Sequence, residues 1–461
     1  MPSSRAYLLL GHLLFLGLFI LAFIHAVPRV VHVDSAFQFF KWTEVPGIAV
    51  EAHRYTAIIP QLLVKLAMAL GVPLKGLTVV ASLAHVLVPY VIFLVIGHGM
   101  RQPWLAMGLV LAQVLATRLT FYGIVLEANY LLSYPFLLAA VLAGPMARTN
   151  DKRSFLLALA ALFLVLLVHP LGAFVALFVL VHHRFNGTAG SRPLYVLMCI
   201  ALIWPLLGRL LFPPTSYESG LYSALAEGFG GDVPFTQLPG LRFLLDHTAT
   251  YTTFYLPLWC AFAVLAVLLV QRKAWAVLGL VLSATVLFIL IHVWAYHAGE
   301  TAMMMEKNFL PLTVFVALPL VLEIRRMSVR TQWWGLLPFA LALFVQFRGI
   351  SFASRPAWER VDHIAALVDR CKEEGVRKAC VDPAVLDARG LHIHWALAFE
   401  TLLLSAQHGA EQSVTVVARK ECVTNGGCVE LSELVDGQRI CGDGDRYYQL
   451  PNGPYVLLSA H

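Results

Sequence analysis

The chain has 461 residues, of which 59% are apolar and only 13% are charged. A soluble protein carries about 25% charged residues, so this composition excludes an ordinary soluble enzyme, and it also excludes a disordered chain. The net charge of +6 does not indicate nucleic-acid binding, because the basic residues cluster at the ends of apolar runs, as membrane orientation requires. Charged residues concentrate towards the C-terminus, which predicts a membrane domain over 1–354 and a soluble domain over 355–461.

Many apolar stretches have the composition of transmembrane helices, which need about 20 mostly apolar residues each. They are 6–27, 77–98, 103–123, 130–147, 154–168, 170–183, 193–212, 253–270, 274–295, 308–324 and 332–350. The first is too long for a signal peptide, so we interpret it as a retained span. Two short stretches flank His169-Pro170, where we expect half-length helices that meet near one membrane surface. The predicted fold is an all-α polytopic membrane protein with about eleven transmembrane helices and a small C-terminal α+β domain.

Lys and Arg residues at the ends of the spans predict the orientation of the protein. With a cytoplasmic N-terminus, Arg148, Arg153, Arg272, Lys273 and Arg326 fall in short cytoplasmic loops. An odd number of spans then places the C-terminal domain on the extracytoplasmic side, as expected for a bacterial inner-membrane protein. Most carboxylates before residue 355 face outward in this topology, so we expect the chemistry at the outer face.

The predicted external domain contains several cysteines, which indicate at least one disulfide in an oxidising compartment. They are Cys371, Cys380, Cys422, Cys428 and Cys441. The pairing with the shortest loops joins Cys371 to Cys380 and Cys422 to Cys428, although sequence does not fix the connectivity. A zinc site is the alternative, because His392 and His394 lie between the cysteine pairs. Residues 358–374 predict a helix, and 413–418 and 454–459 predict strands.

Several outer loops bring acidic, basic and histidine side chains to the same membrane face. The first loop, residues 28–76, contains an apolar segment at 59–71 that we expect to lie along the membrane interface. The candidate residues, in chain order, are Asp34, Glu51, His53 and Arg54 in this loop, and then Glu127, His169, His297, Glu306 and Lys307. Such a set suits a site that activates a hydroxyl and holds a phosphate.

The order of these elements resembles the C-type (GT-C) glycosyltransferases, multispanning enzymes that include aminoarabinose transferases and protein O-mannosyltransferases. The stretch 34–39 resembles their acidic motif after the first span, and 60–71 their Pro-containing amphipathic segment. Residues 169–172 resemble the tip of a short two-span hairpin, and 306–311 a late E-R-Y-L-L-P type segment. The resemblance implies an inverting transfer of a sugar from a polyprenyl-phosphate donor to a lipid, glycan or protein acceptor.

This chemistry needs a base on the acceptor hydroxyl and a cation near the leaving phosphate. We assign Asp34 as the catalytic base. The predicted substrate-binding residues are Arg54, His53 and Lys307 for the phosphate, Glu51, Glu127 and His297 for hydroxyl groups, and His169 and Glu306 in the adjoining motifs. The acids and histidines allow a divalent metal, but no ligand spacing requires one, and no other cofactor is expected.

Each assignment has a structural alternative. Asp34 is a favourable helix N-cap, Glu127 and His169 suit helix ends, and Glu306 and Lys307 form a plausible ion pair. The alternative functions are a polysaccharide polymerase or ligase, a non-enzymatic membrane subunit, and a lipid or solute transporter. A polymerase or ligase would carry a basic outer loop, and a transporter would carry charges at mid-membrane. The loop 213–252 is mainly acidic and the spans are nearly free of charge, which favours the transferase.

Overall fold

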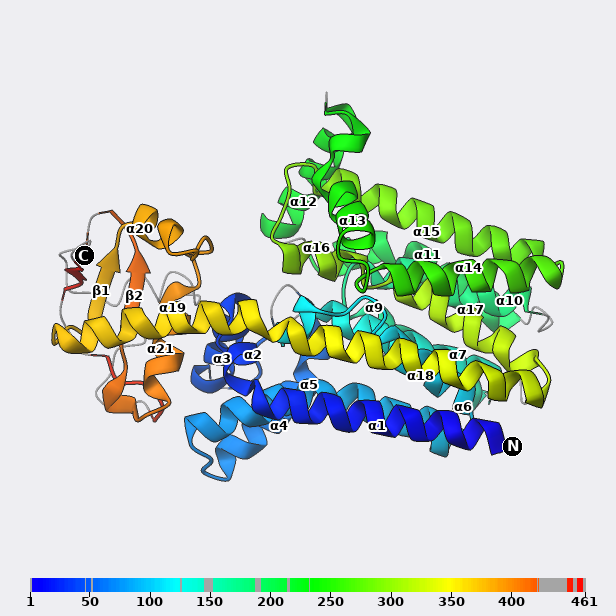
Figure 1. Ribbon diagram of the computed structural model, residues 1–461, viewed down its shortest axis with the longest axis horizontal. Helices are drawn as coiled ribbons and strands as arrows, with labels where there is room; N and C mark the ends of the chain where they lie inside the picture. Colours follow the sequence, from blue (N-terminus) through cyan, green and yellow to red (C-terminus); the bar gives the residue numbers. More distant parts are fainter. Residues whose placement is uncertain are drawn as a thin grey trace.

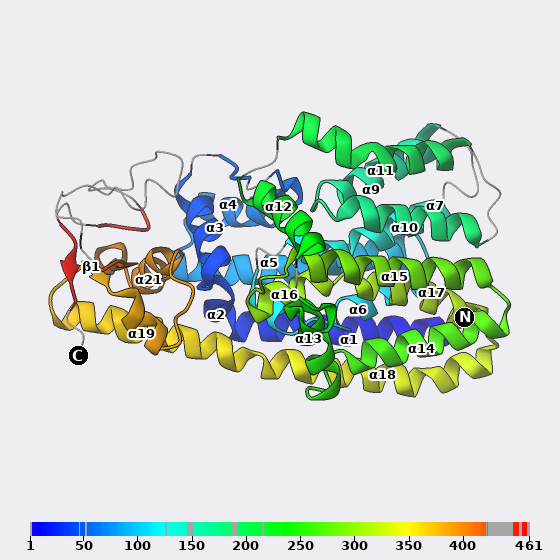
Figure 2. The ribbon, with the colours of Figure 1, turned by 90° about the horizontal axis from the view of Figure 1, so that it is seen from above.

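Long apolar helices lie side by side along the longest axis of the molecule (Figure 1, Figure 2). The computed structural model describes residues 2–45, 47–50, 53–124, 127–144, 152–186, 192–213, 216–231, 233–420, 422, 446–450 and 454–458. The helices that correspond to the predicted spans are α1 (Pro2–Ile24), α5 (Leu74–Leu94), α6 (Pro103–Ala112), α7 (Tyr134–Ala143), α9 (Lys152–Leu166), α10 (Gly172–Phe185), α11 (Arg192–Leu211), α14 (Leu256–Gln271), α15 (Trp275–Ala295), α17 (Leu312–Arg326) and α18 (Val329–Phe352).

Shorter elements connect these helices. They are α2 (Ala26–Val30), α3 (Val33–Glu44), η1 (Tyr55–Ala57), α4 (Ile58–Ala69), η2 (Val95–Gly99), η3 (Leu119–Tyr122), η4 (Glu127–Leu132), α12 (Ser216–Gly230), η5 (Phe235–Gln237), α13 (Pro239–Ala249) and α16 (Ala302–Phe309). The C-terminal part contains α19 (Ser354–Glu373), β1 (Lys378–Val381), α20 (Pro383–Ala388), α21 (Leu397–Ala406), η6 (Ala410–Gln412), β2 (Thr415–Ala418) and β3 (Val456–Leu457).

Among the described residues, 6 helices are long and apolar enough to cross a membrane. They are Ser4–Ile24, Leu74–Gly99, Arg192–Leu211, Trp275–Ala295, Ala302–Arg326 and Val329–Glu373. Large apolar side chains stay exposed on the outside of the bundle, for example Leu13 and Phe23 on α1 and Leu337 on α18. Such a surface is unusual in a soluble monomer and suits contact with lipid. The helices therefore support a multi-pass helical membrane protein.

In the two predicted spans 103–123 and 130–147, the helices α6 and α7 are shorter than the predicted stretches. Helix α6 ends at Ala112 and α7 begins at Tyr134, and the chain between them forms the buried 3-10 turns η3 and η4. The reason lies in Arg118, whose buried guanidinium donates to the carbonyl oxygens of Gln346 (2.9 Å) and Thr253. Non-helical backbone at membrane depth is tolerated where protein groups satisfy its hydrogen bonds.

The break predicted at His169-Pro170 is present. Helices α9 and α10 have 15 and 14 residues, and a turn that contains His169 separates them. Gly172 is the first residue of α10. A side chain at this position would collide with the carbonyl oxygen of Val165. The hairpin tip therefore needs glycine for a close approach of two backbone segments.

Helix α4 forms within the stretch predicted to lie along the membrane interface. One face is exposed and apolar, with Ile59, Leu62 and Leu66, whereas Gln61 and Val64 are fully buried against the protein. A helix with a buried inner face and an exposed apolar outer face suits the boundary between headgroups and acyl chains.

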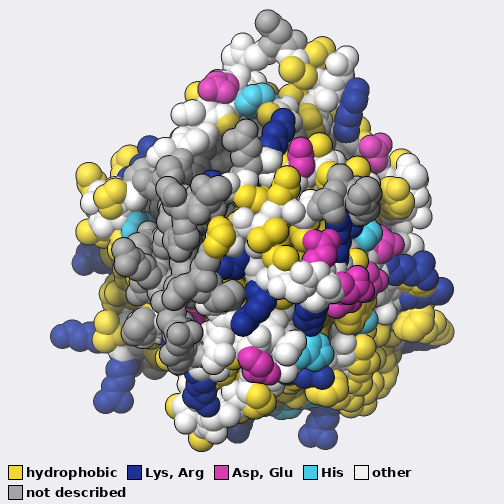
Figure 3. All heavy atoms as spheres, turned by 90° about the vertical axis from the view of Figure 1, so that its left-hand side faces the viewer, with side chains coloured by type: hydrophobic (Ala, Val, Ile, Leu, Met, Phe, Trp, Pro, Cys, Tyr) yellow, Lys and Arg dark blue, Asp and Glu magenta, His cyan; other side chains and the backbone are white. Residues whose placement is uncertain are grey.

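The C-terminal residues form a small parallel sheet with the order β2-β1-β3. The predicted helix corresponds to α19, and the two predicted strands correspond to β2 and β3. Helix α19 continues directly from α18, so the last long helix of the bundle runs into this domain (Figure 1). Figure 3 views the domain end-on and shows acidic and basic side chains among apolar ones, as on a water-exposed surface.

The predicted pairing of Cys371 with Cys380 is wrong. Cys380 forms a disulfide with Cys422 across a Cα–Cα distance of 5.8 Å, and Cys371 is a buried free thiol. Cys380 lies on β1 and the chain reaches Cys422 shortly after the neighbouring strand β2, whereas α19 points Cys371 into the domain core. At least one disulfide is thus confirmed, while Cys428 and Cys441 lie outside the described residues.

Candidate functional site

Charged side chains from several separate segments of the chain act on Asp34. Asp34 comes from the first turn of α3, Arg54 from the loop before η1, and Glu127 from the start of η4. Lys307 lies in the last turn of α16, and Glu300 lies just before that helix. The charges of the other four residues all act on Asp34. We call these five residues the charged cluster.

Asp34 is the only member of the charged cluster on α3, and it lies in the first turn rather than at the N-cap, which is His32. Its carboxylate forms no hydrogen bond or ion pair with the described residues. Burial raises the pKa of Asp34. The positive charges of Lys307 and Arg54 oppose this rise, and the negative charge of Glu127 adds to it. A half-buried carboxylate without a partner is able to take up a proton from a substrate.

The basic members of the charged cluster differ in their contacts. Arg54 donates from Nη1 to the Glu127 carboxylate at 2.8 Å, and these side chains are only 12% and 5% exposed. Lys307 is also buried, yet it forms no ion pair with the described residues, although it feels the charges of Asp34 and Glu127. The Lys307 ammonium is therefore the cation of the cluster that a bound anion would neutralise most directly.

The backbone is strained immediately before both Asp34 and Arg54. Val33 has a φ of 36° and His53 a φ of 57°, in the left-handed region that residues other than glycine rarely adopt. For the β-branched Val33 this conformation is a clear outlier. Such strain persists only where the surroundings over-determine it, and it is concentrated at functional sites.

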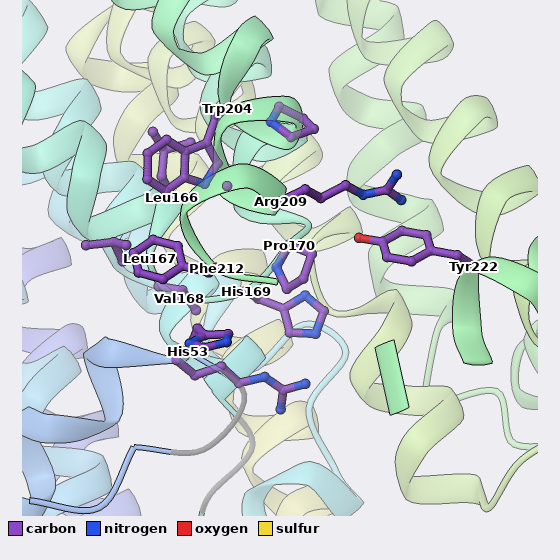
Figure 4. A pocket seen from close by; sticks show the side chains of 13 residues that line it. His53, Leu166, Leu167, Val168, His169, Pro170, Trp204, Arg209, Phe212 and Tyr222 are labelled. Carbon is purple, nitrogen blue, oxygen red and sulfur yellow. The ribbon is translucent and has the colours of Figure 1, made fainter. Parts of the chain in front are cut away.

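A groove opens beside the charged cluster, and Arg54 belongs to both; the empty space of the groove, open solvent included, is about 680 Å³. Its polar lining residues are His53, Arg54, His169, Trp204, Arg209 and Tyr222. Figure 4 shows Arg209 and Tyr222 on one side and His53 with His169 on the other. The Arg209 guanidinium lies 3.9 Å from the centre of the Tyr222 ring, and the His53 ring lies 5.3 Å from Phe212.

Arg54 links the groove to the charged cluster. Arg54 lines the groove and pairs with Glu127, while Arg54 and Lys307 both act electrostatically on His169. Burial first, and then these positive charges, hold the pKa of His169 well below its usual value, so its imidazole is neutral near pH 7. Helix α11, which lines the groove through Trp204 and Arg209, also carries the exposed Leu206 and Leu210.

Glu306 has a structural role instead of the predicted role in substrate binding. Its fully buried carboxylate accepts the backbone N–H groups of Arg118 (2.6 Å), Leu119 (2.8 Å) and Thr120 (3.0 Å), and also the Thr120 hydroxyl. The predicted ion pair of Glu306 with Lys307 is absent among the described contacts. Glu306 thus fixes the turn η3, and the next residue, Lys307, faces the charged cluster.

Another predicted residue, His297, lies outside the charged cluster. His297 packs against α12, where a Cβ on Gly228 would lie 3.2 Å from its Nδ1 atom. Glu51 lies outside the described residues. Within the described residues, no group of three or more His, Cys, Asp or Glu side chains could hold a metal ion.

Some residues of the site had no signal in the sequence. Glu300 precedes α16 and acts on Asp34, and Arg209, Trp204 and Tyr222 line the groove from α11 and α12. An arginine at the end of an apolar helix is usually an orientation signal, and a tryptophan there an interface anchor. Only the three-dimensional arrangement shows whether such an arginine or tryptophan also lines a groove. Comparison of the chain with protein-family models, curated proteins and solved structures finds no match.

Proposed function

We propose that this protein is a membrane glycosyltransferase of the GT-C type. It moves a sugar from a polyprenyl-phosphate donor to an acceptor hydroxyl, with inversion at the anomeric carbon. The observation that carries the proposal is the Asp34 carboxylate, which has no hydrogen bond or ion pair with the described residues and feels the charge of the buried Lys307. Arg54 links this cluster to a groove that helix α11 also lines. This combination supplies a base, a cation for phosphate and access from lipid.

The proposed reaction uses the members of the charged cluster in separate roles. Asp34 removes the proton from the acceptor hydroxyl, whose oxygen attacks the anomeric carbon of the sugar. The bond between that carbon and the phosphate oxygen breaks, and the polyprenyl phosphate leaves with the electron pair. Lys307 and Arg54 stabilise the developing phosphate charge, because ammonium and guanidinium groups suit phosphate oxygens. Glu127 orients Arg54 through their ion pair.

The groove is the proposed path of the donor from the bilayer. Arg209 lies near the outer end of α11 and lines the groove together with His53. A donor phosphate would meet Arg209 first and Lys307 at the reaction site, while its polyprenyl chain stays against the exposed Leu206 and Leu210. Neutral His169 would contribute a hydrogen bond to a sugar hydroxyl without repelling the cations.

The proposed topology keeps about eleven membrane-inserted segments, a cytoplasmic N-terminus and an extracytoplasmic C-terminal domain. The N-terminus and the C-terminal domain lie at opposite ends of the helices, and the charged cluster lies near the domain end (Figure 1). Short helices such as α6 and α7 would span part of the bilayer each. A bacterial inner membrane is the proposed location.

The experiment that tests the function uses radiolabelled polyprenyl-phosphate sugars. The full chain is reconstituted in liposomes, a panel of such sugars is added together with cell-envelope acceptors, and the labelled lipid, glycan and protein fractions are separated. We expect one donor sugar to pass into one acceptor fraction only when the protein is present. If no donor of the panel transfers its labelled sugar to any acceptor fraction, the result would contradict the proposal.

A further inference from the structure

A chain of hydrogen bonds leads from the C-terminal domain to the residue before Asp34. Arg360 on α19 donates from Nε and Nη2 to the two carboxylate oxygens of Glu400 on α21, each at 2.7 Å. The Glu400 side chain is fully buried and that of Arg360 is 11% exposed. Arg360 Nη2 also donates to the carbonyl oxygen of Ile393 at 2.9 Å, which fixes the guanidinium from a third direction.

Glu400 also reaches out of its own domain. Its Oε1 atom accepts the backbone N–H of Val33 at 2.8 Å. Val33 is the first residue of α3, so its N–H has no acceptor within the helix. Val33 is also the residue with the strained φ of 36°. Glu400 therefore satisfies an otherwise orphaned buried donor and holds the backbone conformation from which Asp34 projects.

We propose that Glu400, held by Arg360, is a positioning residue that sets the location of the Asp34 carboxylate. The inference deepens the proposed function and rests on it, because it assumes that Asp34 is the base. It also gives the C-terminal domain a role in the reaction, although the described part of that domain contributes no residue to the charged cluster or the groove.

Apolar packing alone does not fix the start of α3. Phe37 and Phe40 of α3 pack on Phe399 of α21 with ring centroids 5.1 Å and 5.3 Å apart. These contacts lie one turn or more beyond Asp34 and set the spacing of the helices. The first turn is held by directional bonds as well: Glu400 accepts the N–H of Val33, and the Ser35 hydroxyl accepts the N–H of Ile124 at 3.1 Å. Asp34 lies between these two anchored residues.

A matched pair of double variants separates positioning from folding. The first double variant, Arg360→Met with Glu400→Gln, removes both charges and keeps an amide oxygen that can accept the Val33 N–H; we call it the amide pair. The second, Arg360→Met with Glu400→Leu, removes both charges and the acceptor; we call it the apolar pair. Replacing a buried ion pair by apolar side chains is often tolerated, and Glu400→Met replaces Glu400→Leu if the leucine variant does not accumulate.

Amide hydrogen exchange tests the positioning without any substrate. Peptides that cover residues 31–36 should exchange faster by about 10-fold or more in the apolar pair than in the amide pair, because only the apolar pair loses the local bond. Peptides from α18 should exchange alike in both. Equal exchange of 31–36 in the two variants would overturn the inference, whatever the activity of the protein.

Turnover of the radiolabelled polyprenyl-phosphate sugar that the wild-type protein uses gives the second test. The apolar pair should lower kcat by about 10-fold to 100-fold relative to the amide pair, with an unchanged KM for the donor, because a displacement of about 1 Å can reduce a rate by this much. In an Asp34→Asn background the two pairs should differ by less than about twofold, since a residue that acts through Asp34 has no further effect there.

The results of this second test distinguish the two proposals. An equal loss of kcat with and without Asp34 would show a general structural role and would overturn the inference. Full activity of Asp34→Asn alone would contradict the proposed base, and the exchange measurement would still decide whether Glu400 holds the start of α3. Glu323→Gln is the matched control, because Glu323 is a buried carboxylate in an ion pair with Arg326 at 2.5 Å, and it should leave kcat unchanged.

Discussion

At the scale of single residues, the environment of Asp34 decides whether it can act as a base. Its pKa is raised by burial, while Lys307 is the strongest influence in the opposite direction. A base works only when deprotonated, so the rate should fall as the pH drops through this raised pKa. The acidic limb of the pH–rate profile is therefore expected at a higher pH than for an ordinary aspartate.

Two substitutions should move this limb in opposite directions. Lys307→Met removes a positive charge, so the pKa of Asp34 rises further and the acidic limb moves to higher pH, together with a loss of maximal rate. Glu127→Gln removes a negative charge and releases Arg54 from its ion pair, so the limb moves to lower pH. The measurement is kcat/KM for the donor as a function of pH. A profile that neither substitution moves would assign the limb to another group.

The sequence predicts much of the charged cluster because its members stand in loops next to apolar helices. This pattern predicts Asp34, Arg54, Glu127 and Lys307 as site residues, and in the structure the charges of the other three act on Asp34. The role of Glu306 could not be chosen, because a carboxylate beside a lysine looks the same whether it binds a substrate or three backbone amides. The bond from Glu400 to Val33 joins residues 367 positions apart, and no local pattern signals it.

At the scale of elements, the turn η3 depends on one carboxylate. Glu306 accepts three buried backbone N–H groups and a hydroxyl from residues 118–120. An unsatisfied buried donor costs about 1–3 kcal/mol, so Glu306→Ala should destabilise the protein by several such contributions. Thermal unfolding in detergent should show a clearly lowered Tm, with a smaller effect for Glu306→Gln. A Tm equal to that of the wild type would show that η3 does not depend on Glu306.

Apolar length predicted the existence of the helices better than their ends. The predicted stretch 193–212 and helix α11 nearly coincide, because no charged residue interrupts this helix before Arg209 in its last turn. The stretch 103–123 is equally apolar, yet α6 stops at Ala112. The difference comes from Arg118 and Glu306, whose contacts with distant elements make non-helical backbone favourable. Hydropathy measures transfer into lipid and does not register such contacts.

Across the whole molecule, the proposed topology places the C-terminal domain and the charged cluster on the same side of the membrane. Single cysteines at Gly230 and Glu411, in a chain whose cysteines other than the disulfide-bonded Cys380 and Cys422 are all replaced, should react with a membrane-impermeant maleimide from outside intact cells. A cysteine at Arg330 should react only after permeabilisation. Labelling of position 411 only after permeabilisation would place the domain in the cytoplasm and would contradict the proposed topology.

The C-terminal domain is bonded to the membrane bundle through helix α19. Helix α19 continues from α18 and carries Arg360, which holds Glu400 and through it the start of α3. The Trp358 indole N–H donates to His25 Nδ1 at 2.9 Å and ties the same helix to the end of α1. A domain that composition alone marked as separate is thus bonded to the segment that carries Asp34.

The central claim is that Asp34 is the catalytic base, and replacement of its carboxylate tests this most directly. The measurement is the single-turnover rate of sugar transfer from the radiolabelled polyprenyl-phosphate donor by reconstituted wild-type, Asp34→Asn and Asp246→Asn proteins in equal amounts. Asp246 is an exposed aspartate on α13, so it controls for the change of charge. We predict that Asp34→Asn lowers the rate by about 10²-fold to 10⁴-fold, the usual contribution of a general base, and that Asp246→Asn leaves it unchanged. A folded, inserted Asp34→Asn protein with the full rate of transfer would contradict the account.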